Sequence, residues 1–246
     1  MILIEKLFRS SIGKKILVAV SGLGMGLFLL AHMSGNLLMF AGPDAINEYA
    51  AGMRRLFSFG EFPLALWGAR FGLLAFFLMH VSLTLVLAYE NKKARPVSYQ
   101  YQGSVQLTFA SRTMIITGAL VLFFIIYHLL HFTMGDVHSQ YFNIRDHLGR
   151  HNVYEMLIRN FRHKTEFLGV RWPFITLSYL GALGILGLHL HHGIASLFQT
   201  LSAVRSQTNY AFFRKLSAGI VLIIIGGFSS VPLAILVGIL KLAGEK

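Results

Sequence analysis

The sequence contains no cysteine and few charged residues. Without cysteine, the chain forms no disulfide, no cysteine-ligated zinc site and no iron–sulfur cluster of its own. Charged residues make up 13% of its 246 residues, whereas 55% are hydrophobic. A soluble domain of this length cannot bury that much apolar surface. The composition therefore excludes an ordinary soluble protein and indicates a chain embedded in a membrane.

Acidic residues are especially scarce, with 10 aspartates and glutamates against 22 lysines and arginines and a net charge of +12. In a soluble protein this charge would suggest nucleic acid as a partner. Here the basic residues lie in short segments beside apolar runs, a pattern typical of contact with lipid headgroups or with an acidic partner subunit. Nucleic acid is therefore not expected as a partner.

Long apolar runs dominate the rest of the sequence. Crossing a hydrocarbon layer of about 30 Å takes a helix of about 20 apolar residues. Five stretches qualify, at residues 16–40, 63–89, 113–134, 173–198 and 216–240. They predict an all-α integral membrane protein, a bundle of five transmembrane helices that forms a single membrane domain over residues 1–246. The sequence shows no internal repeat.

Basic residues mark one end of the predicted bundle. Lys6, Arg9, Lys14 and Lys15 precede the first span, which favours a cytoplasmic N-terminus. The apolar part of this span is longer than in a signal peptide, so it is expected to remain in the protein as a helix. With five spans, the long connection of residues 135–171 then lies on the extracytoplasmic side, although it carries basic residues of its own.

Histidine is the unusual residue inside the spans. Seven of the eleven histidines lie there, namely His32, His80, His128, His131, His189, His191 and His192. A polar ring inside lipid usually faces a cavity, a partner or a cofactor. A single such ring is equally well explained as a structural histidine bonded to a neighbouring carbonyl group. Their distribution over four spans favours a shared function.

Depth along the spans sorts four of these histidines into two layers. At about 1.5 Å per residue, His32 and His128 lie roughly 25 Å from the inner ends of their spans, and His80 and His189 lie roughly 15 Å from them. Two imidazoles that face each other at one depth can hold a haem iron. The sequence thus predicts two stacked haems. Spacing alone does not decide between His128 and His131, and His192 leaves the same ambiguity for His189.

Small residues accompany the histidines in two of the spans. Gly22, Gly24 and Gly26 lie in the first span, and Gly181, Gly184 and Gly187 lie in the fourth. Missing side chains leave room for a flat macrocycle, or equally for a closely packed neighbouring helix.

A few polar residues are candidates for contacts to a redox group. Arg70 and Arg112 could bind the carboxylates of haem, with Ser21 near the inner haem, or the two arginines could extend to the membrane interface. Glu48 and Glu61 lie in the first outer loop and could handle the protons of a redox ligand, or simply be solvated.

Several short motifs make the sequence resemble the di-haem cytochrome b subunit of succinate:quinone oxidoreductases, in the type with a single five-helix anchor. The resemblance covers nearly the whole chain. Each motif is weak alone, but their order and spacing are fairly specific. They are SIGKK at 11–15, HMSGN at 32–36, ENK at 90–92 with RP at 95–96, SRT at 111–113, YHLLH at 127–131 and HLHHG at 189–193.

The resemblance implies two haem b groups with His32, His80, His128 and His189 as axial ligands. It also implies a flavoprotein subunit carrying FAD and an iron–sulfur subunit, both docked on the cytoplasmic face of a bacterial inner membrane. The complex would oxidise succinate or reduce fumarate and exchange electrons with quinone, commonly menaquinone, so this chain alone would carry no dicarboxylate chemistry. Glu48 and Glu61 are then the candidate quinone-site residues.

The sequence departs from the family in two places. Residues 135–171 are unusually long and rich in charge and histidine, so no role can be carried over to them. Some members place a glutamate for proton transfer two residues before the fourth ligand, where this chain has Gly187. Two alternatives stay open: the haem b subunit of another quinone-linked dehydrogenase, such as a hydrogenase or formate dehydrogenase, and a transporter with buried histidines and no haem.

Overall fold

The computed structural model describes residues 2–56, 58–59, 62–94, 113–167, 169–201, 206–242 and 244–245, and most of them are helical. Five helices are long and apolar enough to cross a membrane. They are α2 (Ser11–Leu37, continued by the 3-10 turn Leu38–Ala41), α4 (Leu64–Lys93), α6 (Met114–His128, continued by the π-helical turn Leu129–Met134), α8 (Phe174–Thr200) and α9 (Gln207–Leu236).

Each predicted span corresponds to one of these helices, and this prediction is confirmed. Two helices begin earlier than the apolar run because a serine caps them. Ser10 accepts a hydrogen bond from the Gly13 amide at 3.0 Å, and Ser206 accepts one from the Asn209 amide at 3.2 Å. A capping hydroxyl satisfies an amide that otherwise lacks a partner in the first turn.

The spans are helical, as predicted, and the chain also contains structure outside them. Short elements lie between and beside the spans: α1 (Ile2–Arg9), α3 (Pro43–Arg55), the strand pair β1 (Ser58–Phe59) and β2 (Phe62–Pro63), α7 (Val153–Arg162), and the strand pair β3 (Thr165–Phe167) and β4 (Val170–Trp172). The connection of residues 135–171, expected as a long loop, therefore contains a helix and a hairpin.

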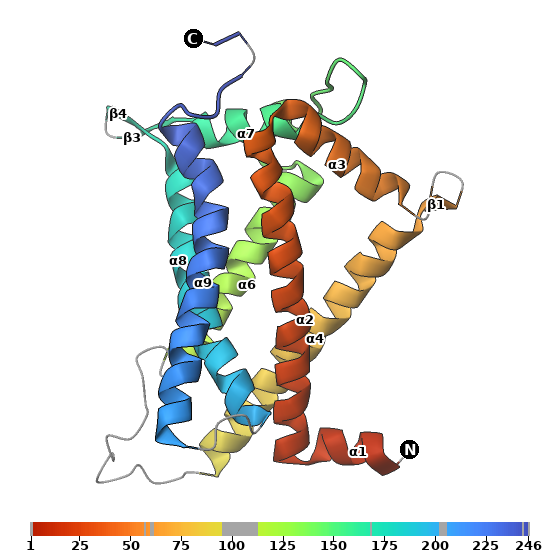
Figure 1. The fold of residues 1–246 in the computed structure, drawn as a ribbon, viewed down its shortest axis with the longest axis vertical. Coiled ribbons are helices and arrows are strands. Elements are labelled where there is room, and N and C mark those ends of the chain that lie inside the picture. Colours follow the sequence, from red (N-terminus) through yellow and green to blue (C-terminus); the bar gives the residue numbers. More distant parts are fainter. Residues whose placement is uncertain are drawn as a thin grey trace.

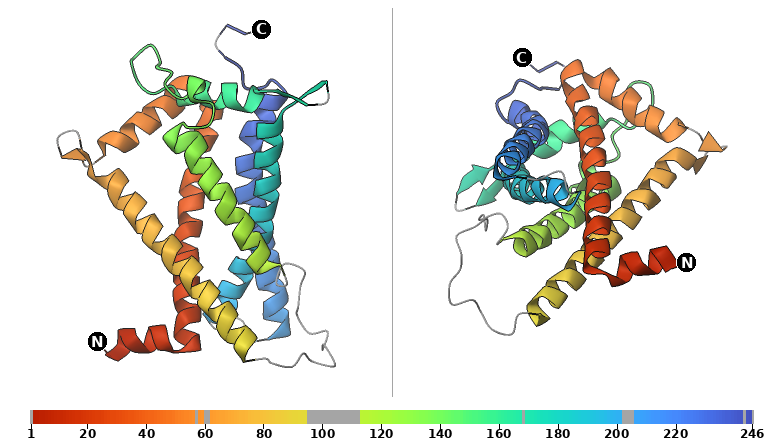
Figure 2. Two further views of the ribbon diagram at one scale, coloured as in Figure 1. Left: turned by 180° about the vertical axis from the view of Figure 1, so that it is seen from behind. Right: turned by 60° about the horizontal axis from the view of Figure 1, so that its bottom comes forward.

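The two ends of the bundle differ (Figure 1). Helix α1, the end of α8 and the start of α9 lie at one end, here called the N-terminal end. Helices α3 and α7, the β3–β4 hairpin and the C-terminus lie at the other, here called the cap end, which Figure 2 shows from behind. Between the ends, α8 packs along α9, α2 packs along α4, and α6 packs on α8.

The main buried cluster lies at the cap end. Ile158 and Phe161 of α7 pack with Ile175 and Tyr179 of α8 and Ile235 of α9. Ile158 and Ile235 are almost fully buried, and full burial of such a side chain contributes about 1.5–3 kcal/mol. The amphipathic helix α7 thus closes one end of the bundle.

Polar contacts hold the C-terminal segment on this cap. The Tyr154 hydroxyl donates to the Lys241 carbonyl at 3.1 Å, and Arg162 donates to the Leu240 carbonyl at 3.0 Å and pairs with Glu245.

Away from the cap, the spans expose much of their apolar surface, for example Phe71 and Leu78 of α4 and Leu222 of α9. These side chains suit contact with lipid.

Candidate haem site

One pair of histidines lies toward the cap end, and we call it the cap-side pair. His32 comes from α2, and His128 is the last residue of α6. Their ring centroids lie 5.9 Å apart at an interplanar angle of 77°. Phe28 and Phe228 each lie with ring centroids 5.5 Å from His32, so aromatic side chains surround this imidazole.

A second pair, the N-side pair, lies nearer the N-terminal end. His80 comes from α4 and His189 from α8, and their ring centroids are 6.4 Å apart at 67°. The rings that depth had grouped from sequence therefore lie side by side in the fold. Two metal–nitrogen bonds of about 2 Å and about 1 Å from each nitrogen to its ring centre add to about 6 Å, so the rings of each pair are close enough for both to reach one metal ion.

Hydrogen bonds orient the N-side pair. The Val18 carbonyl lies 3.2 Å from His80 Nδ1, and a carbonyl can only accept, so Nδ1 carries the hydrogen. On the other ring, the Thr117 hydroxyl donates to the Met114 carbonyl at 3.1 Å and therefore accepts from His189 Nδ1 at 3.3 Å. Both rings then keep the lone pair on Nε2, the form that binds a metal.

A longer network orients the cap-side pair, and it starts at Asn160. The Asn160 amide nitrogen donates to the Met156 carbonyl at 2.9 Å, so its oxygen faces His131 Nε2, 2.8 Å away. His131 must then accept at Nδ1, where the Tyr179 hydroxyl donates at 3.0 Å. The Tyr179 oxygen is left to accept from His128 Nδ1, 3.5 Å away, so the His128 lone pair also lies on Nε2.

This network separates His128 from His131. His131 is 1% exposed and uses both ring nitrogens in hydrogen bonds, so neither is free for a metal. On the fourth span, His191 Nδ1 bonds to Ser217 of α9 at 2.9 Å, and the Ser217 hydroxyl donates to the His191 carbonyl at 2.7 Å. His131 is thus a structural histidine, and the side chain and backbone of His191 are tied to α9.

The walls beside the N-side pair are glycines on two different spans. A Cβ atom at Gly22 of α2 would lie 3.4 Å from the His80 ring, and one at Gly118 of α6 would lie 3.3 Å from the His189 ring. A larger side chain at either position would displace the imidazole. By contrast, a Cβ at Gly24 would collide with Phe76, which indicates plain helix packing.

These contacts reveal a short pattern that the sequence reading missed. In α2 and again in α6, a hydroxyl residue is followed by a glycine that lies ten residues before a histidine. The residues are Ser21-Gly22 before His32 and Thr117-Gly118 before His128. In both helices the hydroxyl-glycine pair touches a histidine of the N-side pair, and the later histidine belongs to the cap-side pair.

Ser21, predicted near the inner haem, lies beside His80 of the N-side pair. It is fully buried, donates to backbone carbonyls of its own helix and lies 3.4 Å from His80 Nδ1. Arg70 is exposed, with its guanidinium 5.0 Å from the centroid of the Trp67 ring. Arg112 and Glu61 lie outside the described residues.

Glu48, the other quinone-site candidate, is held in ion pairs at the cap end. It pairs with Arg150 at 2.8 Å and with Arg55 at 3.8 Å. Gly187 faces α9, where a Cβ would lie 3.3 Å from Ile225, so this position serves helix packing.

More histidines continue from His131 toward the cap. The His131 and His138 ring centroids are 5.7 Å apart, and His138 lies 4.5 Å from His163. Burial, and then the neighbouring His163, hold the pKa of His138 below its ordinary value. Within the described residues no three histidine or carboxylate side chains gather to hold a metal ion, so these rings do not form a conventional metal site.

Comparisons with models of protein families, with curated proteins and with solved structures give no match for this chain. The functional reading therefore depends on the geometry of the site and on the sequence motifs.

Proposed function

We propose that this chain is a membrane-anchor cytochrome b subunit. It would carry electrons between an iron–sulfur subunit of a succinate dehydrogenase or fumarate reductase and quinone in the membrane. His32 and His128 would hold one haem b, and His80 and His189 would hold the other. Bound haem supplies one-electron exchange, and the protein supplies ligands, orientation and an apolar surrounding.

A single observation carries the proposal. Imidazoles from four separate membrane helices lie two by two, with ring centroids 5.9 Å and 6.4 Å apart. Three of the four have Nδ1 within reach of a hydrogen-bond acceptor, which leaves Nε2 for iron. Metal-binding histidines usually have their second nitrogen held in this way. A transporter would not need two such matched pairs.

The residues of this chain would act by holding and orienting. Val18 and Thr117 fix the tautomer and plane of the N-side rings, and Tyr179 does so for His128. Phe28 and Phe228 exclude water from the His32 side. A ligand shell without water favours rapid electron exchange because little solvent has to reorganise.

The charges at the N-terminal end suit a docked partner subunit. Lys15 lies exposed in the first turns of α2 there, and Lys92 and Lys93 are exposed at the end of α4. An iron–sulfur subunit, with its flavoprotein neighbour, would dock at this end on the cytoplasmic side. Electrons would then pass first to the N-side pair and next to the cap-side pair, in the proposed orientation.

Haem quantification with a reduced-minus-oxidised spectrum tests the proposal. We expect two haem b groups per chain, one of which is lost in His128→Ala and the other in His189→Ala. His147→Gln, a change at an exposed loop histidine, serves as the control and should retain both. A chain without a b-type band would refute the haem assignment.

Pull-down of the intact complex tests the partner. A flavoprotein and an iron–sulfur subunit with succinate-dependent haem reduction are expected. A hydrogenase or formate dehydrogenase subunit in their place would refute the succinate assignment while leaving the haem sites standing.

A further inference from the structure

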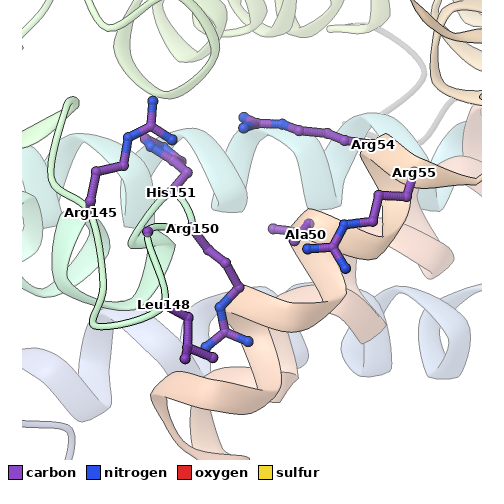
Figure 3. Close-up of a pocket in the computed structure, with 9 residues that line it drawn as sticks. Ala50, Arg54, Arg55, Arg145, Leu148, Arg150 and His151 are labelled. Atoms are coloured by element: carbon purple, nitrogen blue, oxygen red, sulfur yellow. The ribbon is translucent and has the colours of Figure 1, made fainter. Parts of the chain in front are cut away.

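A cavity of about 260 Å³ lies at the cap end, between the last turn of α3 and residues 145–151. Its walls are strongly basic: Arg54 and Arg55 come from α3, and Arg145, Arg150 and His151 come from the facing loop (Figure 3). This cavity belongs to neither histidine pair, and the proposed function does not use it.

One of these arginines is already neutralised. Arg150 pairs with Asp146 at 2.7 Å and with Asp44 and Glu48 at 2.8 Å each. Burial disfavours the Asp146 carboxylate, but hydrogen bonds from Arg150 and from backbone amides bring the pKa of Asp146 below its ordinary value. The Asp146 carboxylate also accepts from the Leu148 amide at 3.0 Å, so the loop is fixed against α3 before any ligand arrives.

Arg54 and Arg145 lie outside this ion-pair cluster, and the four arginines together exceed the three carboxylates by one positive charge. Among the described residues neither Arg54 nor Arg145 forms an ion pair, and Arg55 makes one long contact of 3.8 Å to Glu48. In Figure 3, Arg54 extends from α3 toward Arg145 and His151. Burial and then the charges of Arg54 and Arg145 hold the pKa of His151 below its ordinary value. Two unpaired guanidinium groups that converge repel each other unless an anion lies between them.

Guanidinium groups favour phosphate because their paired N–H donors match two phosphate oxygens. One exposed apolar side chain, Leu148 of the loop, lines the cavity beside these basic groups. Helix α3, which forms one wall, lies at the cap end of the transmembrane bundle (Figure 1), and lipid headgroups lie at the ends of membrane-spanning helices. A lipid phosphate would reach the arginines with its apolar part beside Leu148.

We propose that this cavity is a binding site for a phosphate ester, and that its occupant is the headgroup of an anionic phospholipid held by Arg54 and Arg145. Zwitterionic lipid binds more weakly because its ammonium group is repelled by the same arginines. The site anchors α3 and the loop to the membrane surface at the cap end.

The test is native mass spectrometry of the full chain released from nanodiscs. Phosphatidylglycerol and phosphatidylcholine nanodiscs are compared for wild type and for Arg54→Gln/Arg145→Gln. Lys164→Gln/Arg171→Gln is the matched control, because it removes the same charge from exposed residues at the same end of the bundle. We expect retained phosphatidylglycerol in wild type and control, and at least about tenfold weaker retention in the double variant.

Two further measurements keep the proposal open to refutation. Ala51→Glu places a carboxylate in the cavity wall and should displace the lipid phosphate even if the arginine variant folds poorly. Inorganic phosphate added to lipid-free protein in detergent separates the two sources: a phosphate-dependent rise in melting temperature without phosphatidylglycerol retention overturns the lipid occupant. Equal retention in the double variant and the control overturns the site. Haem content is measured in the same samples, so failure of the haem proposal is distinguishable.

Discussion

The hydroxyl of Tyr179 bridges two histidines, and its removal should affect one haem and leave the other unchanged. In Tyr179→Phe the ring keeps its packing, because Tyr179 is 6% exposed and surrounded by Phe124, Phe132 and Phe161. Only the hydroxyl contacts are lost, those to His131 at 3.0 Å and to His128 at 3.5 Å.

The magnitude follows from these two distances. The 3.0 Å contact is an ordinary hydrogen bond, and leaving the buried His131 Nδ1 without a donor costs about 1–3 kcal/mol of stability. The 3.5 Å contact is at the limit of a hydrogen bond, so its effect on His128 is at most about 1 kcal/mol, equal to about 40 mV for a one-electron couple. An acceptor at Nδ1 makes imidazole a better donor to ferric iron, so its loss raises the reduction potential.

Redox titration of the haem absorbance is the assay. Tyr179→Phe should raise the potential of the cap-side haem alone. Thr117→Val removes the acceptor at His189 and should raise the potential of the N-side haem alone. The shifts should add in the double variant because the sites lie about 15 Å apart by the helical rise. If Tyr179→Phe lowers the melting temperature without moving either potential, Tyr179 is a packing residue and the orienting role is wrong.

Three other perturbations test features of the fold. Glu90→Gln leaves the Lys14 ammonium, 9% exposed, without its carboxylate partner. Because the Glu90 side of the pair is 41% exposed, thermal unfolding in detergent should show a loss of about 1–3 kcal/mol, unlike Lys15→Gln at an exposed position. Arg150 lowers the pKa of Asp146, so the stability gained from this pair is fully present above the ordinary carboxyl pKa. It is lost as the pH falls through the lowered pKa. In a pH–stability curve, Asp146→Asn should therefore flatten the fall in stability below about pH 4. Burial and the neighbouring arginines lower the pKa of His151, so it becomes charged only as the pH falls below the ordinary histidine value of about 6.5. Phosphatidylglycerol retention should strengthen over that fall in pH. His151→Gln should remove this pH dependence.

The spans were readable from the sequence because hydropathy over about 20 residues is a strong signal. The grouping of His32 with His128 was also accessible, since a fixed rise per residue converts sequence position into depth. The sequence could not decide between His128 and His131 as the ligand, because residues three apart share a helix face. The choice depends on Asn160 and Tyr179, which lie 29 and 48 positions from His131 in the chain.

The cap was missed for a different reason. Helix α7 alternates apolar and charged residues within a segment that reads as a polar connection, and only its packing against Tyr179 and Ile235 shows it as part of the core. The ion-pair cluster around Arg150 joins residues about 100 positions apart, namely Asp44 and Glu48 with the loop before α7. No local pattern indicates such contacts.

The ten-residue offset within α2 and α6 fixes the geometry between the two layers. Gly22 and His32 lie on one continuous helix, as do Gly118 and His128. Each of these helices therefore contacts the N-side pair through its glycine and supplies one histidine of the cap-side pair. Ten residues at 3.6 per turn leave the two contact points about 80° apart around each helix. The spacing between the two proposed haem sites is therefore set by continuous helices and not by the connecting segments.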